Sequence, residues 1–312
     1  MRLRGAPFAF AAAILGLGLA TPSWAGPSTS VIQDVGSWID ARLGSRRDEA
    51  ETNQSFVRLT PGFTVGSHDA FEERLRARVK LDLPNTRNRL SLLLLDEDDP
   101  GQQASSVDLE SDRLLLPDRE QDTRFGLQYV PFREALQHVS ATVSVNSDLD
   151  PTANVRWRRS FRYGENTSLR LTLSPGWRNG SGFTTIAAAD VDHQVGDGVV
   201  RASLQGQHED DGETLGARLG YFYPWNEATL LGAFVEGQAA FAGPAFKDTG
   251  RFALLHRQRL GEENYYLTFL PFVAWQPEGP APDVQYGFQF ELDVYIGGGR
   301  RGQGSTSAEV RD

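Results

Sequence analysis

The sequence has 312 residues, with 31 basic and 41 acidic side chains, a formal net charge of −10, no cysteine and a mean hydropathy of −0.39. The acidic balance argues against nucleic acid as a partner, and the absence of cysteine excludes a disulfide framework and thiol catalysis. After the first 25 residues there is no run of about 18 apolar residues, which excludes a helical membrane protein. A transmembrane β-barrel remains compatible, because only one side chain in two along its strands faces lipid.

Residues 1–25 have the features of a cleaved secretory signal peptide. Arg2 and Arg4 form a basic start, residues 6–20 are an apolar run too short for an ordinary membrane-spanning helix, and small residues precede Gly26. Cleavage there removes two arginines, so the remaining chain carries 29 basic and 41 acidic side chains, a net charge of 29 − 41 = −12. We therefore expect an exported protein.

A short amphipathic helix is expected at residues 30–43, and the polar residues 46–53 form a linker, so that 26–53 precede the barrel. Helical spacing puts Asp34 and Ser37 away from one apolar face. That face carries Val31, Val35, Trp38, Ile39 and Leu43. Two positions are open for this helix. It enters the barrel from the periplasmic side as a plug or gate, an arrangement that resembles some outer-membrane fatty-acid transporters, or it lies against the barrel rim or the inner leaflet surface.

From residue 54 onward the dominant pattern is alternation of apolar and polar side chains. In residues 71–83 the odd positions from Leu75 to Leu83 are apolar, while the even positions from Arg74 to Asp82 are charged. A helix would mix these two sets, whereas a strand separates them onto two faces. Similar runs occur near residues 54–66, 70–83, 88–96, 122–131, 137–147, 152–163, 166–177, 183–192, 198–208, 213–223, 228–240, 247–260, 264–276 and 282–296.

These runs predict an all-β fold, a transmembrane antiparallel up-and-down β-barrel of about 14 strands over residues 54–298. Most runs have the roughly 9 to 11 residues that a tilted membrane strand requires, and closure leaves no unpaired strand edge in lipid. Twelve strands are also possible, because the runs at 88–96 and 183–192 are weakly patterned. A soluble periplasmic sandwich or barrel is the competing interpretation, since alternation does not say whether the apolar face points inward or outward.

The connections predict two different ends of the barrel. Turns rich in Gly and Asn at 84–85, 164–166, 196–198 and 261–264 are expected on the periplasmic side together with both termini. The longer connections, chiefly 97–121, are expected outside. That stretch is acidic, and it is either a solvated loop or a region that binds calcium or bridges lipopolysaccharide through divalent ions. The residues concerned are Asp96, Glu97, Asp98, Asp99, Asp108, Glu110 and Asp112.

The last run resembles the signal recognised by the outer-membrane assembly machinery. Gln285, Gly287, Phe290 and Leu292 match its polar-x-Gly-x-x-hydrophobic-x-hydrophobic pattern, although the chain continues past it into a Gly-rich tail at 299–312 that is expected to be disordered. The layout of 54–298, with arginine-rich hairpins, the run at 270–275 and the closing run at 290–298, resembles proteobacterial outer-membrane barrel proteins. The resemblance implies a fold and an outer-membrane location, and it transfers no activity.

The polar faces of the predicted strands are unusually rich in arginine, whereas the chain has only two lysines. Because guanidinium groups are always charged and bind carboxylate or phosphate with a fixed fork, a ring of them inside a pore would favour anions. The candidate lumen residues are Arg74, Arg76, Arg78, Arg156, Arg158, Arg162, Arg170, Arg201, Arg218, Arg257, Arg259, Glu291 and Asp293, with Arg58 and Arg251 on the same faces. The alternative is a satisfied ionic network in which these arginines pair with Glu72, Asp82, Asp190, Glu236, Glu291 and Asp293.

The function predicted from these features is a passive channel or small-solute transporter for anionic solutes, with no cofactor, metal or catalytic residue assigned. Its expected partners are outer-membrane lipid, lipopolysaccharide and, during biogenesis, the assembly machinery. A closed structural barrel is one alternative. A lipid hydrolase is another, because His138, Ser140 and Asn154 faintly resemble the His-x-Ser and downstream Asn of outer-membrane phospholipase A. The step from Ser140 to Asn154 is longer than in that family, and both His138 and Ser140 fall on the polar face near a periplasmic turn.

Overall fold

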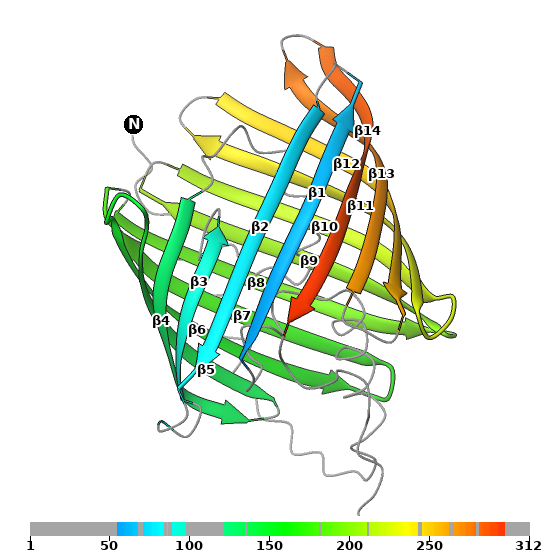
Figure 1. Ribbon diagram of the computed structural model, residues 1–312. Coiled ribbons are helices and arrows are strands. Elements are labelled where there is room, and N and C mark those ends of the chain that lie inside the picture. The colour runs from blue at the N-terminus through cyan, green and yellow to red at the C-terminus, as the bar shows by residue number, and fades with distance from the viewer. Residues whose placement is uncertain are drawn as a thin grey trace, which may run out of the picture.

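Fourteen antiparallel strands close into a single barrel in the computed structural model (Figure 1). The structure describes residues 55–67, 71–83, 86, 89–97, 122–134, 136–180, 182–210, 212–242, 245–261, 265–278 and 281–296. Each strand pairs with its neighbours in the chain, and β1 pairs with β14 to close the sheet. The predicted up-and-down barrel of 14 strands is thus confirmed. The signal peptide, the 30–43 helix, the linker and the 299–312 tail lie outside the described residues.

The observed strands agree with the alternating runs to within three residues at every end. They are β1 (Phe56–Gly66), β2 (Phe71–Asp82), β3 (Leu90–Glu97), β4 (Asp122–Glu134), β5 (Gln137–Val145), β6 (Pro151–Tyr163), β7 (Thr167–Arg178), β8 (Gly182–Val195), β9 (Gly198–Glu209), β10 (Gly212–Pro224), β11 (Thr229–Ala242), β12 (Ala245–Leu260), β13 (Tyr265–Glu278) and β14 (Ala281–Ile296). The weakly patterned runs at 88–96 and 183–192 are both strands, β3 and β8.

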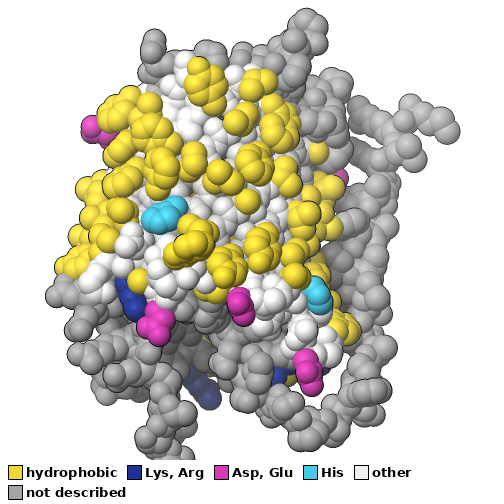
Figure 2. Space-filling model, turned by 90° about the vertical axis from the view of Figure 1, so that its right-hand side faces the viewer, with side chains coloured by type: hydrophobic (Ala, Val, Ile, Leu, Met, Phe, Trp, Pro, Cys, Tyr) yellow, Lys and Arg dark blue, Asp and Glu magenta, His cyan; other side chains and the backbone are white. Residues whose placement is uncertain are grey.

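The strands alternate between a polar interior and an apolar exterior, as β12 illustrates. Arg251 and Arg257 face the interior and are 0% and 4% exposed, whereas Phe252 and Leu254 face outward and are about half exposed. The face in Figure 2 shows the outcome, because hydrophobic side chains cover most of its described surface and acidic ones gather along its lower edge. An apolar face that points outward on a closed sheet fits a lipid environment and not a soluble barrel.

The end of the barrel that carries the start of β1 and the end of β14 has tight turns, as predicted. Gly164, Gly196 and Gly261 lie in three of these turns with φ of 64°, 59° and 67°, a left-handed conformation that glycine adopts without steric cost. Residues 84 and 85, where a fourth tight turn is predicted, lie outside the described residues.

The opposite end differs from the prediction that its connections are generally longer. The connections at 146–150, 179–181 and 210–211 are as short as those at the terminal end, and only the β3–β4 connection is long. The reason is that the strands extend further than a membrane requires, to 16 residues in β12 and β14, against the roughly 9 to 11 of a tilted membrane strand. Backbone hydrogen bonding between neighbouring strands therefore absorbs residues that would otherwise form loops.

Candidate functional site: the barrel interior

Every arginine and carboxylate predicted to face the lumen lies on the interior side of its strand. Seven of the predicted set are buried, namely Arg74, Arg76, Arg156, Arg201, Arg257, Glu291 and Asp293. The other six are partly buried and alternate in the same register, namely Arg78, Arg158, Arg162, Arg170, Arg218 and Arg259. These residues thus share the interior faces of their strands, their role toward anions stays a prediction, and the structure adds how the charges are combined.

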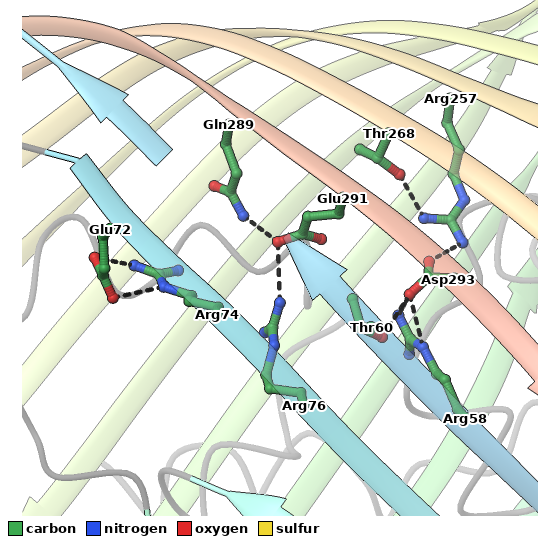
Figure 3. A network of polar contacts seen from close by, with 10 residues as sticks. All are labelled: Arg58, Thr60, Glu72, Arg74, Arg76, Arg257, Thr268, Gln289, Glu291 and Asp293. Atoms are coloured by element: carbon green, nitrogen blue, oxygen red, sulfur yellow. Dashed lines mark hydrogen bonds and ion pairs between the residues drawn. The ribbon is translucent and has the colours of Figure 1, made fainter. Parts of the chain in front are cut away.

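Asp293 on β14 is the centre of the most complete group of contacts (Figure 3). Arg58 donates to its Oδ1 from Nε at 2.9 Å and Nη2 at 2.6 Å, and the Thr60 hydroxyl donates to the same oxygen at 2.8 Å. From the other side, Nη2 of Arg257 lies 2.7 Å from Oδ2, and its Nη1 donates to Thr268 at 2.8 Å. A fully buried carboxylate thus has two guanidinium partners and a hydroxyl, which offsets the cost of removing it from water.

A second group surrounds Glu291, two residues earlier on the same strand (Figure 3). Nη2 of Arg76 on β2 lies 2.9 Å from Glu291 Oε1, and Gln289 donates its side-chain amide to the same oxygen. Further along β2, Arg74 makes a two-pronged contact with Glu72 at 2.7 and 2.8 Å. We call the interior faces of β12, β13, β14, β1 and β2, which carry these two groups, the paired wall.

Aromatic rings support the arginines of the paired wall. The guanidinium of Arg58 lies 5.5 Å from the ring centre of Tyr295, and that of Arg257 lies 5.0 Å from the ring centre of Tyr266. The two tyrosine rings meet edge to face at 5.8 Å. Because a ring face attracts a cation and restricts its rotamers, these tyrosines hold both arginines in place against Asp293.

Further ion pairs extend the network across β8 to β12. Glu236 on β11 lies between Arg218 and Arg251, with Arg218 Nε and Arg251 Nη2 each 2.5 Å from a carboxylate oxygen. Both guanidinium groups also lie within 5.4 Å of the Phe234 ring centre. Asp192 on β8 accepts two hydrogen bonds from Arg201, at 2.6 and 2.9 Å.

The predicted carboxylate partners Glu72, Asp82, Glu236, Glu291 and Asp293 all take part in ion pairs. The sixth, Asp190, lies directly opposite Arg170 in the β7–β8 register. Sequence reasoning missed Asp192, although its parity with Asp190 would have revealed it. Lys80, on the predicted polar face of the 71–83 run, lies 3.7 Å from Asp82.

The interior faces of β4 to β7 have a different composition. Among the side chains that the structure describes, they carry six arginines, Arg124, Arg156, Arg158, Arg162, Arg170 and Arg178, whereas the sequences of β5, β6 and β7 contain no Asp or Glu. Buried hydroxyl side chains fill the positions between them, and Arg124 Nη1 donates to Thr152 at 2.6 Å. We call this surface the arginine wall. Arg124 and Arg178 were not among the predicted lumen residues.

A third interior surface is apolar and was not predicted. It comprises Val199, Phe222, Leu230, Phe234, Ala253, Leu255, Leu270, Phe272 and Ala274, all at most 5% exposed, and we call it the apolar patch. Along their strands these residues occupy the same alternate positions as Arg218, Glu236 and Arg251, and so they point to the same side of the sheet. The patch therefore lies inside the barrel on β9 to β13, where a water-filled lumen would favour polar side chains.

The candidate hydrolase residues do not form a catalytic arrangement at a lipid surface. His138 and Ser140 are each 3% exposed and face the interior on β5, in agreement with the predicted polar face. In the β5–β6 register they lie opposite Arg158 and Arg156, whereas Asn154 lies opposite Thr142. The Asn is thus not brought to Ser140, and neither residue reaches the outer surface.

The assembly-signal residues lie on β14 beside the closing strand β1. The Phe290 ring stacks on Phe63 at 5.3 Å. At Gly287 an added Cβ would lie 2.2 Å from the Val65 carbonyl oxygen, so only glycine fits where β14 meets β1. This packing gives Gly287 and Phe290 a role in closing the sheet, and recognition by the assembly machinery stays a prediction.

No group of His, Cys, Asp and Glu in the described ranges is arranged to hold a metal ion. Among the same residues no helix is long and apolar enough to cross a membrane. Of the acidic stretch considered as a calcium site, residues 98–121 and the side chains of Asp96 and Glu97 lie outside the description.

No protein-family model matches the chain, and neither does any curated protein. Solved structures similar to it include OmpT of Vibrio cholerae, with 10% identity and a TM-score of 0.47 over 78% of this chain and 96% of that one. OccAB2 of Acinetobacter baumannii has 7% identity and a TM-score of 0.48 over 78% and 97% of the two chains, and OprD of Pseudomonas aeruginosa has 7% and 0.46 over 78% and 95%. By its own strand pairing, the chain is a closed antiparallel barrel of 14 strands with a charged interior.

Proposed function

We propose that this protein is an outer-membrane barrel that admits small anions along its arginine wall. The main observation in support of this proposal is the charge of that wall. Six interior arginines lie on β4, β6 and β7, and the sequences of β5, β6 and β7 contain no carboxylate. Fixed guanidinium groups inside a low-dielectric wall raise the local concentration of anions and disfavour cations. The hydroxyl side chains between them offer hydrogen bonds that replace part of an anion's hydration.

The outward surface supports the location. Large apolar side chains are exposed on the described exterior, among them Leu75, Phe125, Val143, Leu254 and Tyr286. Exposed side chains of this kind, present on β2 to β14, would be unfavourable in water, whereas lipid acyl chains match them. Outer-membrane lipid, lipopolysaccharide and the assembly machinery are thus the proposed partners of this surface.

A closed structural barrel is the second candidate, and the paired wall favours it. Lys80, Arg251 and Asp293 are at most 1% exposed, so this side of the interior is packed and not lined by water. Extended around the whole barrel, such packing would leave no path for a solute. The two candidates differ in whether the arginine wall borders a passage.

The distinguishing experiment is single-channel recording of the refolded mature chain in a planar bilayer, with reversal potentials measured in asymmetric KCl. We expect discrete steps with a preference for chloride, and a preference reduced at least twofold in an Arg156→Gln/Arg158→Gln variant. Arg159→Gln is the matched control, because Arg159 lies on the same strand but on the outer parity, with its guanidinium 5.1 Å from the Phe161 ring. Folded barrels without conductance, or with equal selectivity in all three proteins, would overturn the proposal.

A further inference from the structure

We infer that the apolar patch is the docking surface of the chain's own amphipathic segment, residues 30–43, which thereby lies inside the barrel. The inference concerns a contact within the molecule and does not depend on anion passage. It starts from a mismatch, since nine apolar side chains form one cluster on the interior of β9 to β13, whereas most other buried side chains of the described interior are polar or charged. A solute-filled or water-filled interior gives no reason for this cluster.

Glycines of the wall lie against two aromatic rings of the patch. The Phe222 ring lies against Gly220 and Gly232, where an added Cβ would be 3.0 and 2.9 Å from it, and the Phe272 ring lies against Gly287 in the same way. Leu230, Leu255 and Leu270 are nevertheless only 2–3% exposed. An interior of 14 strands is wider than the eight-stranded barrel that wall side chains fill, so leucines that project into it need a further apolar partner to become inaccessible to water.

Residues 30–43 have the chemistry of that partner. At helical spacing Val31, Val35, Trp38 and Ile39 form one apolar face, and Asp40 lies on the opposite face. With the apolar face on the patch, Asp40 points across the interior. In the strand order, β5 of the arginine wall lies seven strands from β12 in either direction, which is the opposite side of the barrel. A carboxylate that points across the interior from the patch therefore faces a positively charged surface.

The position of the segment in the chain allows the contact. Residues 44–55 connect it to β1 and span up to about 40 Å when extended, at roughly 3.3 Å per residue. The nearest strand of the patch, β13, is two strands from β1, a distance of about 10 Å at roughly 4.8 Å per strand. Residues Val199, Phe222 and Leu230 lie near the ends of β9, β10 and β11 at which β1 begins, so the patch extends toward the end of the barrel from which the segment enters.

Disulfide trapping in the full chain tests the contact cleanly, because the sequence contains no cysteine. Val35→Cys is combined in turn with Leu270→Cys on the patch, with Thr142→Cys on the interior of β5, and with Val273→Cys on the outside of β13. After mild oxidation of the folded protein we expect at least tenfold more intramolecular disulfide in the Leu270 pair than in either control pair. Equal trapping at Thr142, trapping only at Val273, or no trapping in any pair would overturn the inference.

A second measurement avoids cysteines in the patch. Hydroxyl-radical footprinting of the wild-type chain and of an Ile39→Asp variant compares oxidation of Leu255, Leu270 and Phe272 with that of Phe252 and Val273 on the outside. We expect the variant to show at least threefold more oxidation of the interior three and no change at the exterior two. Unchanged protection of the interior residues in the variant would mean that another occupant, such as a different segment, a second copy or a bound molecule, covers the patch, and would overturn the inference.

Discussion

The paired wall and the arginine wall both contain many arginines, but they differ in whether the same strands also carry carboxylates that pair with them. In the paired wall Asp293 binds Arg58 and Arg257, and Glu291 binds Arg76, at 2.6–2.9 Å. On β5 to β7 the strands carry arginines and hydroxyl side chains and no carboxylate of their own. The difference suggests a division of roles, in which one side holds the sheet closed and the other supplies charge toward the interior.

The largest effect is expected from breaking the paired wall at its centre. Asp293→Asn keeps the shape of the side chain but leaves Arg58 and Arg257 buried without their shared countercharge, so we expect the free energy of unfolding to fall by about 3–5 kcal/mol. Guanidinium titration of the protein in lipid vesicles measures this. Glu165→Gln, in an exposed turn, is the control that should stay within about 0.5 kcal/mol of wild type. A similar loss in both variants would mean that Asp293 has no special role.

A smaller effect is expected for the second pair of the same wall. A double-mutant cycle with Arg76→Gln and Glu291→Gln should give a coupling free energy of about 2 kcal/mol, because the two side chains are buried and in direct contact. Unfolding of the two single variants and the double variant in vesicles provides the measurement. Strictly additive losses would contradict a direct interaction between these groups.

The contrast can be sharpened by converting one wall into the other. Thr172 on β7 is buried and lies directly opposite Arg158 in the register. A Thr172→Glu substitution introduces a carboxylate beside that arginine, and we expect a gain in unfolding free energy of about 1 kcal/mol together with a loss of chloride preference. Thr172→Gln, of equal size without charge, should show neither change. Destabilisation by the Glu variant beyond that of the Gln variant would show that the wall cannot accept an added countercharge.

The smallest effect is expected in the arginine wall itself. The Arg156→Gln/Arg158→Gln variant should differ from wild type by less than about 1 kcal/mol in unfolding free energy, and the difference should shrink between 0.05 and 0.5 M NaCl as screening weakens interactions among like charges. Parallel titrations at the two salt concentrations test this. A loss of unfolding free energy comparable to that of Asp293→Asn would mean that the arginine wall stabilises the barrel as much as the paired wall does.

Much of the interior could be predicted from the strands alone, because alternation fixes which side chains share a face. Arg74, Arg76 and Asp293 lie on the interior face that this alternation gives them. Four of the six proposed carboxylate partners form ion pairs with arginine, whereas Asp82 pairs with Lys80. The lengths of the connections at the outer end, which were expected to be generally longer, could not be predicted from alternation. Turn-forming residues mark where a strand can end, but they do not say how far cross-strand hydrogen bonding continues beyond the membrane.

The sequence by itself determined the all-β fold class, the approximate strand positions and which side chains share a face, since all three follow from local periodicity that any alternating strand must obey. It left the strand count open between 12 and 14. Only the tertiary structure decided that Arg58 of the first strand and Arg257 of the twelfth share Asp293 of the last, because sheet closure brings Arg58 beside a residue 235 positions away. It also decided that Leu255, Leu270 and Phe272 gather into one interior patch. Strand register and barrel curvature set these contacts, and neither is encoded in the alternation of a single strand.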